Sequence, residues 1–319
     1  MKCIVALLMA GGAIAQQSAV STRTYDVNGR PVEGVRSVEG AGSRSQITRD
    51  VNGRTVPVES VEERVISDSG GVRVVERLVK RHDPNGRPGP AERIRIEEQK
   101  QADGSTRTLT TVSRGDINGS YQVAERSSTL TRVAGDRTDT TTTVERPTLN
   151  GGFELFERRE EAMTKAGPKT TESATTYRRD PNGRLAEAAK KVREAVTEGK
   201  QVKENIAEYE SAATGQMRLA RQSTAVVDPT GSREVTVYVP DAQGRMTVLQ
   251  QQSIERRETP NGTVETTVVR LGDPNAPGRL GPPRKAEEVV CTGECGKKPP
   301  AAATTASAVT EVHKPANAK

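Results

Sequence analysis

The chain has little aromatic or apolar material for its 319 residues. It contains no tryptophan, five tyrosines and two phenylalanines, and only 32% of its residues are hydrophobic. This share is too small for a compact globule of such length, but it suits a sheet with much of both faces in water. The alternative is disorder, which the same composition also favours. The regular turn spacing described below argues for an ordered chain.

The scarcity of aromatics also excludes a class of partner. Nucleic-acid binding relies on a basic stripe or on aromatic platforms for bases. The net charge is +6, with 48 basic and 42 acidic residues interleaved along the chain. We therefore expect no nucleic-acid partner.

Cysteine and histidine are equally rare, with three and two residues. Cys3 lies in a segment that has Lys2, the apolar run Ile4–Ala10 and a small-residue cleavage site. We predict that residues 1–15 are a signal peptide, and that the protein is secreted, periplasmic or at the cell surface.

The two remaining cysteines are Cys291 and Cys295. In a secreted chain such neighbours form a local disulfide. An intermolecular link, free thiols, and a metal or redox role are the open alternatives. The two histidines lie far away in sequence, so we expect neither a metal site nor any cofactor.

Long apolar runs are absent after the signal segment. No stretch approaches the ~18 apolar residues of a membrane helix, which predicts no transmembrane span. An outer-membrane barrel would need one apolar strand face and girdles of aromatic residues. In Val72–Arg81 both alternating sets carry charges, so the sequence argues against such a barrel.

What the chain does contain is a tandem repeat. The motif Asp-x-Asn-Gly-Arg and its looser copies place glycines about 32 residues apart, and a second glycine series falls midway between them. Each copy has the chemistry of a reverse turn, with Asp at the first position and Gly where a positive φ is needed. The full copies supply the predicted structural turn residues, which are Asp26, Asn28, Gly29, Arg30, Asp50, Asn52, Gly53, Arg54, Asp83, Asn85, Gly86, Arg87, Asp180, Asn182, Gly183 and Arg184.

The segments between turns predict long strands. They are rich in Val and Thr, which favour strands. Leu185–Glu198 and Phe153–Lys165 favour helix by residue type, yet they occupy strand positions of the repeat, so we predict strand. The fold class is therefore all-β, with ~32-residue β-hairpin repeats forming a long antiparallel meander of roughly 16 strands that makes a twisted or coiled sheet.

One charge pattern follows the repeat. A Glu stands six residues after the turn glycine in four units, at Glu59, Glu92, Glu125 and Glu157. These residues would form either a repetitive ligand face or a solvated ladder with cations from the intervening strands. We favour the ladder. The turn motif resembles the start of a calcium loop, but its Gly arrives too early and Arg often follows, so we interpret it as a turn.

The composition divides the chain into three parts. Residues 1–15 are the signal peptide and residues 16–281 form the β-hairpin repeat array. From residue 282 to 319 the Pro-, Ala- and Lys-rich sequence predicts a disordered tail that holds the Cys pair.

Tyr25–Arg30 and Arg179–Leu185 resemble the YD (RHS) repeat, whose core is Tyr-Asp-x-x-Gly-Arg-Leu. This resemblance implies hairpin arrays in a bacterial cell-surface protein.

No catalytic motif is present, so we predict that the protein is not an enzyme. The sequence favours a non-catalytic secreted scaffold of the cell envelope or exterior. Alternatives are a glycan- or peptide-binding surface module, and a self-assembling subunit that joins through its sheet edges. The partner is unknown from sequence, with self-association or envelope components as candidates.

Overall fold

The structure is a computed structural model, and it describes residues 18–292 except 27, 40–43, 52–53, 117–118, 181, 213, 274–275 and 277. The predicted signal peptide, residues 1–15, lies outside this range. So do Cys295 and residues 293–319 of the predicted tail.

Strands account for nearly all of the described residues, which contain no helix. The strands are β1 (Ser18–Tyr25), β2 (Pro31–Glu39), β3 (Arg44–Val51), β4 (Arg54–Ser69), β5 (Val72–Arg81), β6 (Glu92–Lys100), β7 (Thr106–Gly115), β8 (Tyr121–Ala134), β9 (Arg137–Pro147), β10 (Phe153–Ala166), β11 (Lys169–Arg179), β12 (Leu185–Glu198), β13 (Gln201–Ser211), β14 (Met217–Val227), β15 (Arg233–Pro240), β16 (Met246–Thr259), β17 (Gly262–Leu271) and β18 (Arg284–Thr292).

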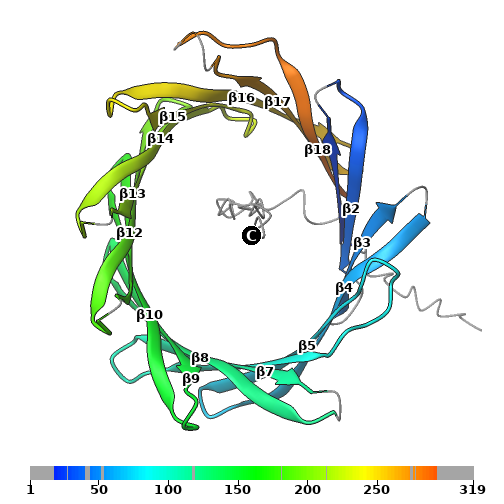
Figure 1. Cartoon of the computed structure of the whole chain (residues 1–319), viewed down its shortest axis with the longest axis vertical. Helices are drawn as coiled ribbons and strands as arrows, with labels where there is room; N and C mark the ends of the chain where they lie inside the picture. Colours follow the sequence, from blue (N-terminus) through cyan, green and yellow to red (C-terminus); the bar gives the residue numbers. More distant parts are fainter. Residues whose placement is uncertain are drawn as a thin grey trace, which may run out of the picture.

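The strands close into a barrel (Figure 1). Each strand pairs antiparallel with the next, and β18 pairs with β1 so that Cys291 lies opposite Val20. The all-β meander of hairpins is thus confirmed, but the open twisted or coiled sheet is wrong. Closure satisfies the backbone groups that the two edges of an open sheet would expose. The sheet has 18 strands rather than the predicted 16.

The helix-forming segment Leu185–Glu198 is a strand, as its position in the repeat predicted. Cross-strand contacts on both sides override its residue preference. Arg193 pairs with Glu172 of β11 at 2.7 Å and with Glu204 of β13 at 2.5 Å.

The predicted tail began too early in the chain. Arg284–Thr292 forms β18, which pairs with β17 on one side and β1 on the other. The Thr292 hydroxyl also donates to the Ala19 carbonyl at 3.3 Å. Pro282 and Pro283 mark only the loop that precedes this closing strand.

The register fixes the size of the barrel. Following the paired residues from Val20 around the wall returns to β1 displaced by about 20 residues. For eighteen strands this displacement corresponds to a tilt of about 37° and a backbone diameter of about 35 Å. We call the end with the Asp-x-Asn-Gly turns the turn rim. The other end, where β1 begins and β18 ends, is the end rim.

A β-bulge interrupts most strands that run away from the turn rim. A bulge residue has no partner opposite it, so residues of one parity lie on opposite faces before and after it. In β8, for example, Val123 faces Ser113 and Glu125 faces Val112, with Ala124 between them. The equivalent residues are Val32, Val58, Phe156, Ala188, Ala220, Leu249 and Ala286.

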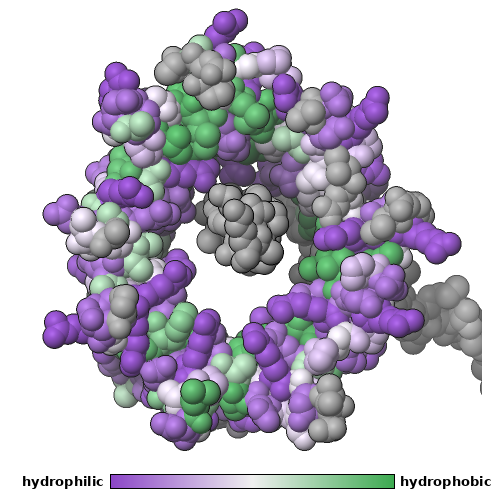
Figure 2. Space-filling model, viewed as in Figure 1, coloured by the Kyte–Doolittle hydropathy of each residue, from purple (hydrophilic) through white to green (hydrophobic). Residues whose placement is uncertain are grey.

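The register also identifies the inner face. From each strand to the next along the chain, the paired residue lies closer to the turn rim. Given the right-handed twist of strands, this direction places Val75, Val79 and Val237 in the lumen. Burial agrees, because side chains crowd on a concave surface. Of the six buried hydrophobic side chains among the described residues, five face the lumen and only Val74 faces outward. Hydrophilic residues border the central opening (Figure 2).

The pairing of β17 with β18 can be tested at Gly262, the first residue of β17. Its φ is +148°, and a Cβ there would lie 1.9 Å from the Cys291 carbonyl oxygen of β18. We expect Gly262→Ala to lower the free energy of unfolding by roughly 3 kcal/mol or more. Gly199→Ala is the matched control, because Gly199 also lies at an end-rim turn and nothing lies within 4 Å of an added Cβ. It should cost only about 1 kcal/mol. Equal denaturation midpoints for the two variants would contradict the observed β17–β18 pairing.

Candidate functional site

The predicted turn residues lie along the turn rim and reverse the chain there. In three of the four copies the Asp amide donates to the Arg carbonyl, at 2.8–2.9 Å. The Asp carboxylate accepts the backbone amides two and four residues later. The glycine has a φ between 74° and 81°. These copies are Asp26, Asn28, Gly29 and Arg30; Asp83, Asn85, Gly86 and Arg87; and Asp180, Asn182, Gly183 and Arg184.

The fourth copy is described only in part. Asp50 lies opposite Thr55, and Val51, the last residue of β3, lies opposite Arg54, the first residue of β4. Asn52 and Gly53 lie outside the described residues.

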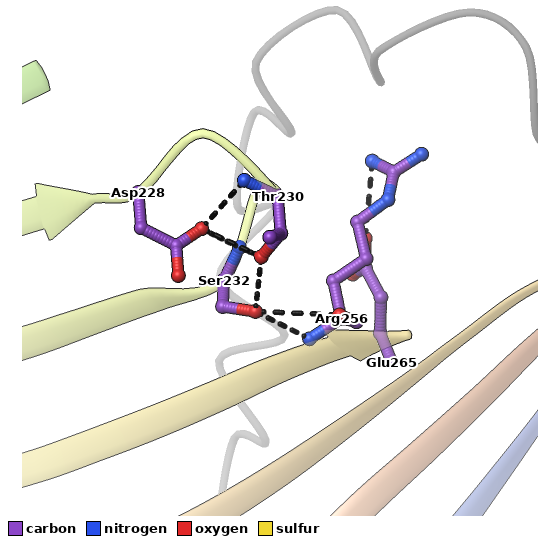
Figure 3. A network of polar contacts seen from close by, with 5 residues as sticks. All are labelled: Asp228, Thr230, Ser232, Arg256 and Glu265. Atoms are coloured by element: carbon purple, nitrogen blue, oxygen red, sulfur yellow. Dashed lines mark hydrogen bonds and ion pairs between the residues drawn. The ribbon is translucent and has the colours of Figure 1, made fainter. Parts of the chain in front are cut away.

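The same turn chemistry recurs at the end rim (Figure 3). The Asp228 carboxylate accepts the Thr230 hydroxyl at 2.6 Å and the amides of Thr230 and Ser232. The Ser232 hydroxyl accepts the Arg256 amide at 2.9 Å, and Arg256 pairs with Glu265 at 3.6 Å. The turn between β14 and β15 is thereby tied to β16 and β17.

The lumen wall carries a level band of alternating charges. From each strand to the next, the residue directly opposite lies higher along the barrel axis, by about one residue on average. Residues at the same height are therefore found about one position closer to the end rim on each successive strand. At one such height, nine consecutive strands from β3 to β11 present alternating Arg and Glu. This set, which we call the charge belt, is Arg49, Glu59, Arg81, Glu92, Arg114, Glu125, Arg146, Glu157 and Arg178.

Ion pairs join neighbouring members of the belt. Arg81 lies 3.4 Å from Glu59, and Arg114 lies 3.1 Å from Glu92. The pairs Arg146–Glu125 and Arg178–Glu157 are 3.2 and 2.8 Å long. The four glutamates of the predicted ladder thus alternate with cations from the intervening strands, as the ladder interpretation required.

Between the belt and the end rim, the lumen wall of β7–β9 is uncharged. Threonines dominate it, and they bond across strands: the hydroxyls of Thr129 and Thr142 are 2.9 Å apart, and those of Thr131 and Thr140 are 3.3 Å apart. The lumen wall of β7–β9 is therefore hydrophilic at both levels.

Aromatic side chains lie at the opposite face of the wall. Six of the seven aromatics of the chain face outward near the turn rim, and Phe156 occupies a bulge, where it stacks under Arg146 of the lumen. Several outward aliphatic residues accompany them, such as Leu155, Leu219 and Val248. The outward aromatics are Tyr25, Tyr121, Phe153, Tyr177, Tyr209 and Tyr238.

Sequence reasoning missed this aromatic row because seven aromatics were judged too few for a girdle and, for Tyr121 and Phe153, because unbroken alternation was assumed. Phe153 and Leu155 share parity with Glu157, yet the bulge at Phe156 sends Glu157 into the lumen. The signal was nevertheless present, since five of the six lie within a few residues of an Asp-x-Asn-Gly turn or one of its looser copies, and Tyr209 lies six residues before the turn glycine Gly215.

Cys291 forms a disulfide. Its predicted partner, Cys295, lies outside the described residues, so the Cys291–Cys295 pairing stays a prediction. Among the described residues, no group of three or more His, Cys, Asp or Glu side chains could hold a metal ion. In the same part of the chain, no helix is long and apolar enough to cross a membrane.

Comparison with solved structures places this fold. A crystal structure of Pseudomonas aeruginosa OccK3 (OpdO) superposes with a TM-score of 0.50 at 11% sequence identity, covering 87% of this chain and 94% of that chain. OccK3 is an outer-membrane porin with a closed 18-stranded barrel. The barrel fold is that of OccK3. A second OpdO structure gives a TM-score of 0.47 at 11% identity and covers 87% and 96% of the two chains. No protein-family model and no curated protein sequence matches the chain.

This likeness corrects several predictions. The YD (RHS) resemblance is wrong, because that family forms meandering sheets wound into shells and this array closes into a porin-type barrel. The scaffold is wrong as well, and so are its binding-module and edge-joined alternatives. A closed barrel has no free sheet edge. The prediction of no transmembrane span is also wrong. It considered only the long apolar runs of membrane helices, whereas porin barrels cross the membrane with strands.

The turn carboxylates set a dependence of stability on pH. A hydrogen bond from the Ser105 hydroxyl lowers the pKa of Asp103, and one from the Thr230 hydroxyl lowers the pKa of Asp228. The amide of Arg245 lowers the pKa of Asp241. A pKa below the unfolded value stabilises the fold above about pH 4 and ceases to do so as the pH falls through the folded pKa.

We therefore expect the denaturation midpoint in detergent to fall between pH 6 and pH 3. The variant Asp103→Asn/Asp228→Asn/Asp241→Asn keeps a side-chain oxygen for the amides but cannot titrate, so its midpoint should fall less. Parallel midpoint curves for the two proteins would show that these carboxylates are not responsible.

Proposed function

We propose that the protein is a water-filled pore of a bacterial outer membrane that lets small polar solutes pass. The observation that carries the proposal is the division of side chains between the two faces of the wall. The lumen holds the charge belt and the threonines, whereas the outer face holds six aromatics at a single rim. Polar lumens and outward aromatic girdles distinguish membrane barrels.

The size of the barrel supports a pore. A backbone diameter of about 35 Å leaves space that wall side chains cannot fill, as in barrels of 16–18 strands. The belt arginines lie against the wall because their partners are on adjacent strands. The fold shared with OccK3, an outer-membrane porin, points the same way.

The outer face also carries charges, and several of them are paired with one another. Glu76 accepts Arg64 at 2.6 Å and lies 3.8 Å from Arg93, and Arg137 pairs with Asp139 at 2.8 Å. An unpaired Arg facing lipid costs roughly 2–4 kcal/mol at the bilayer midplane. Where a cation is paired with a carboxylate, that cost is lower.

The uncharged part of the outer face lies next to the aromatic row. Near the turn rim, β14–β16 present Met217, Leu219, Tyr238, Met246 and Val248, all of which face outward. Tyrosine belongs at the boundary between lipid and water, because its ring is apolar and its hydroxyl hydrogen-bonds to water or headgroups. This patch is where we place the boundary between the headgroups and the hydrocarbon.

A conductance experiment tests the pore. Purified full-length protein added to a planar lipid bilayer should give stepwise increases of current. Thr140 and Thr141 are neighbours on β9, with Thr140 facing the lumen and Thr141 facing outward. A bulky hydrophilic methanethiosulfonate reagent should therefore reduce the step size of Thr140→Cys and leave that of Thr141→Cys unchanged.

The native Cys291 forms a disulfide, and unsubstituted protein treated with the reagent controls for any other reaction. The absence of current steps from folded protein would refute the pore. Equal block of the two variants would refute the assignment of the faces.

A further inference from the structure

The arginines of the charge belt are held in one orientation. In Arg114, Arg146 and Arg178 it is Nε that meets the carboxylate of Glu92, Glu125 or Glu157. A guanidinium is planar, so a partner at Nε leaves the two Nη groups at its far end. The ring of Phe156 also supports the guanidinium face of Arg146, with its carbon 3.6 Å from the ring centre.

Exposure shows which partner a solute in the lumen would meet. The Arg114, Arg146 and Arg178 side chains are 71%, 48% and 60% exposed. The carboxylates that hold them are only 15%, 34% and 23% exposed. The glutamates therefore act as supports at the wall, and the guanidinium ends form the surface toward the lumen.

The spacing of these guanidinium ends is regular. The arginines lie on alternate strands, β7, β9 and β11, and neighbouring strands are about 4.8 Å apart, so successive arginines are about 10 Å apart around the wall. A solute with several anionic groups can contact two or more of them at once. Its second contact is then intramolecular, which strengthens binding without any new kind of interaction.

We infer that the charge belt is a binding track for oligo-anionic solutes, which lie along the lumen wall with their carboxylate or phosphate oxygens on successive arginines. The inference rests on the proposed pore, because it supposes that solutes reach the lumen. The alternating glutamates cancel the long-range field of the arginines. Recognition is therefore by contact with the guanidinium ends, and a solute with one anionic group binds weakly.

Isothermal titration calorimetry on the full chain in detergent tests the track. Tripolyphosphate and the long dicarboxylate azelate are the two oligo-anionic probes, and inorganic phosphate and acetate are their single-group controls. At least one oligo-anion should bind saturably and about tenfold or more tightly than its control. The probe that binds better identifies the source of the anionic oxygens. If neither probe binds better than its control, the inference fails.

Matched variants locate the site. The lumen variant is Arg114→Gln/Arg146→Gln/Arg178→Gln, and it should weaken binding by about tenfold or more. The outer variant is Arg64→Gln/Arg137→Gln/Arg158→Gln, which removes three arginines that are also ion-paired but face outward. It should stay within about twofold of the native protein. Equal loss in both variants would overturn the inference.

A lysine variant separates charge from geometry. Arg114→Lys/Arg146→Lys/Arg178→Lys keeps every charge but lacks the planar end with its two Nη groups. It should also lose affinity, and unchanged binding would contradict recognition by the guanidinium ends. Far-UV circular dichroism confirms that each variant is folded.

The same preparations in planar bilayers keep the two proposals apart. Current steps without oligo-anion binding would leave the pore and remove the track. Binding without current steps would refute the proposed pore and would leave a binding site in the lumen that serves another function.

Discussion

The structure depends on cross-strand register. In most of the strands that run away from the turn rim, a β-bulge resets that register. Because of each bulge, the residues between it and the turn rim lie on the face opposite to the one that unbroken alternation along the strand would give them. Tyr121 and Val123 therefore face outward, while Glu125, of the same parity, faces the lumen. Without the bulge at Ala124, β8 would place a carboxylate and an aromatic on one face.

This register switch recurs with the repeat and so builds features that run around the barrel. The glutamates of β4, β8 and β10 follow directly after bulge residues, and together with Glu92 of β6 they alternate with arginines from β5, β7, β9 and β11. On the other face, Tyr121 and Phe153 precede bulges on their own strands, and the other four aromatics lie on unbulged strands opposite residues that precede a bulge. A single repeating unit of two strands thereby supplies a hydrophilic lumen wall and an interfacial outer rim. The proposed pore needs both.

Part of this architecture could be predicted from the sequence. The turns follow from the local chemistry of Asp, Asn and Gly, and strand positions in the repeat identified β12 despite its helix-forming residues. Closure could not be predicted, because it joins Val20 to Cys291 across almost the whole chain. The bulges were missed because alanines such as Ala124, Ala188 and Ala220 carry no signal that separates them from other strand residues. The rejection of a membrane barrel had another ground, since both faces of Val72–Arg81 carry charges and the chain has only seven aromatics.

Of the charge belt, only the four glutamates were recognised in the sequence. Their arginine partners Arg81, Arg114, Arg146 and Arg178 come from other strands, and each stands five residues before a turn glycine. Which Glu meets which Arg had to be seen in the register. The choice between a ladder and a ligand face also needed side-chain geometry, because only the Nε contacts show that the carboxylates support the arginines. The ladder interpretation concerns the contact between the carboxylates and the arginines, and the proposed solute track concerns the guanidinium ends that face the lumen.

The central claim is that, on strand pairs that contain a bulge, one of two adjacent residues faces lipid and the other faces water. The chain has no tryptophan, so a single introduced tryptophan reports its own surroundings. Tyr238 and Val239 are adjacent on β15, and Tyr238 faces outward while Val239 faces the lumen. In reconstituted liposomes, brominated lipid should quench the fluorescence of Tyr238→Trp, and aqueous acrylamide should quench that of Val239→Trp. Quenching of both variants by acrylamide alone, in protein that remains folded and bound to the liposomes, would contradict the account.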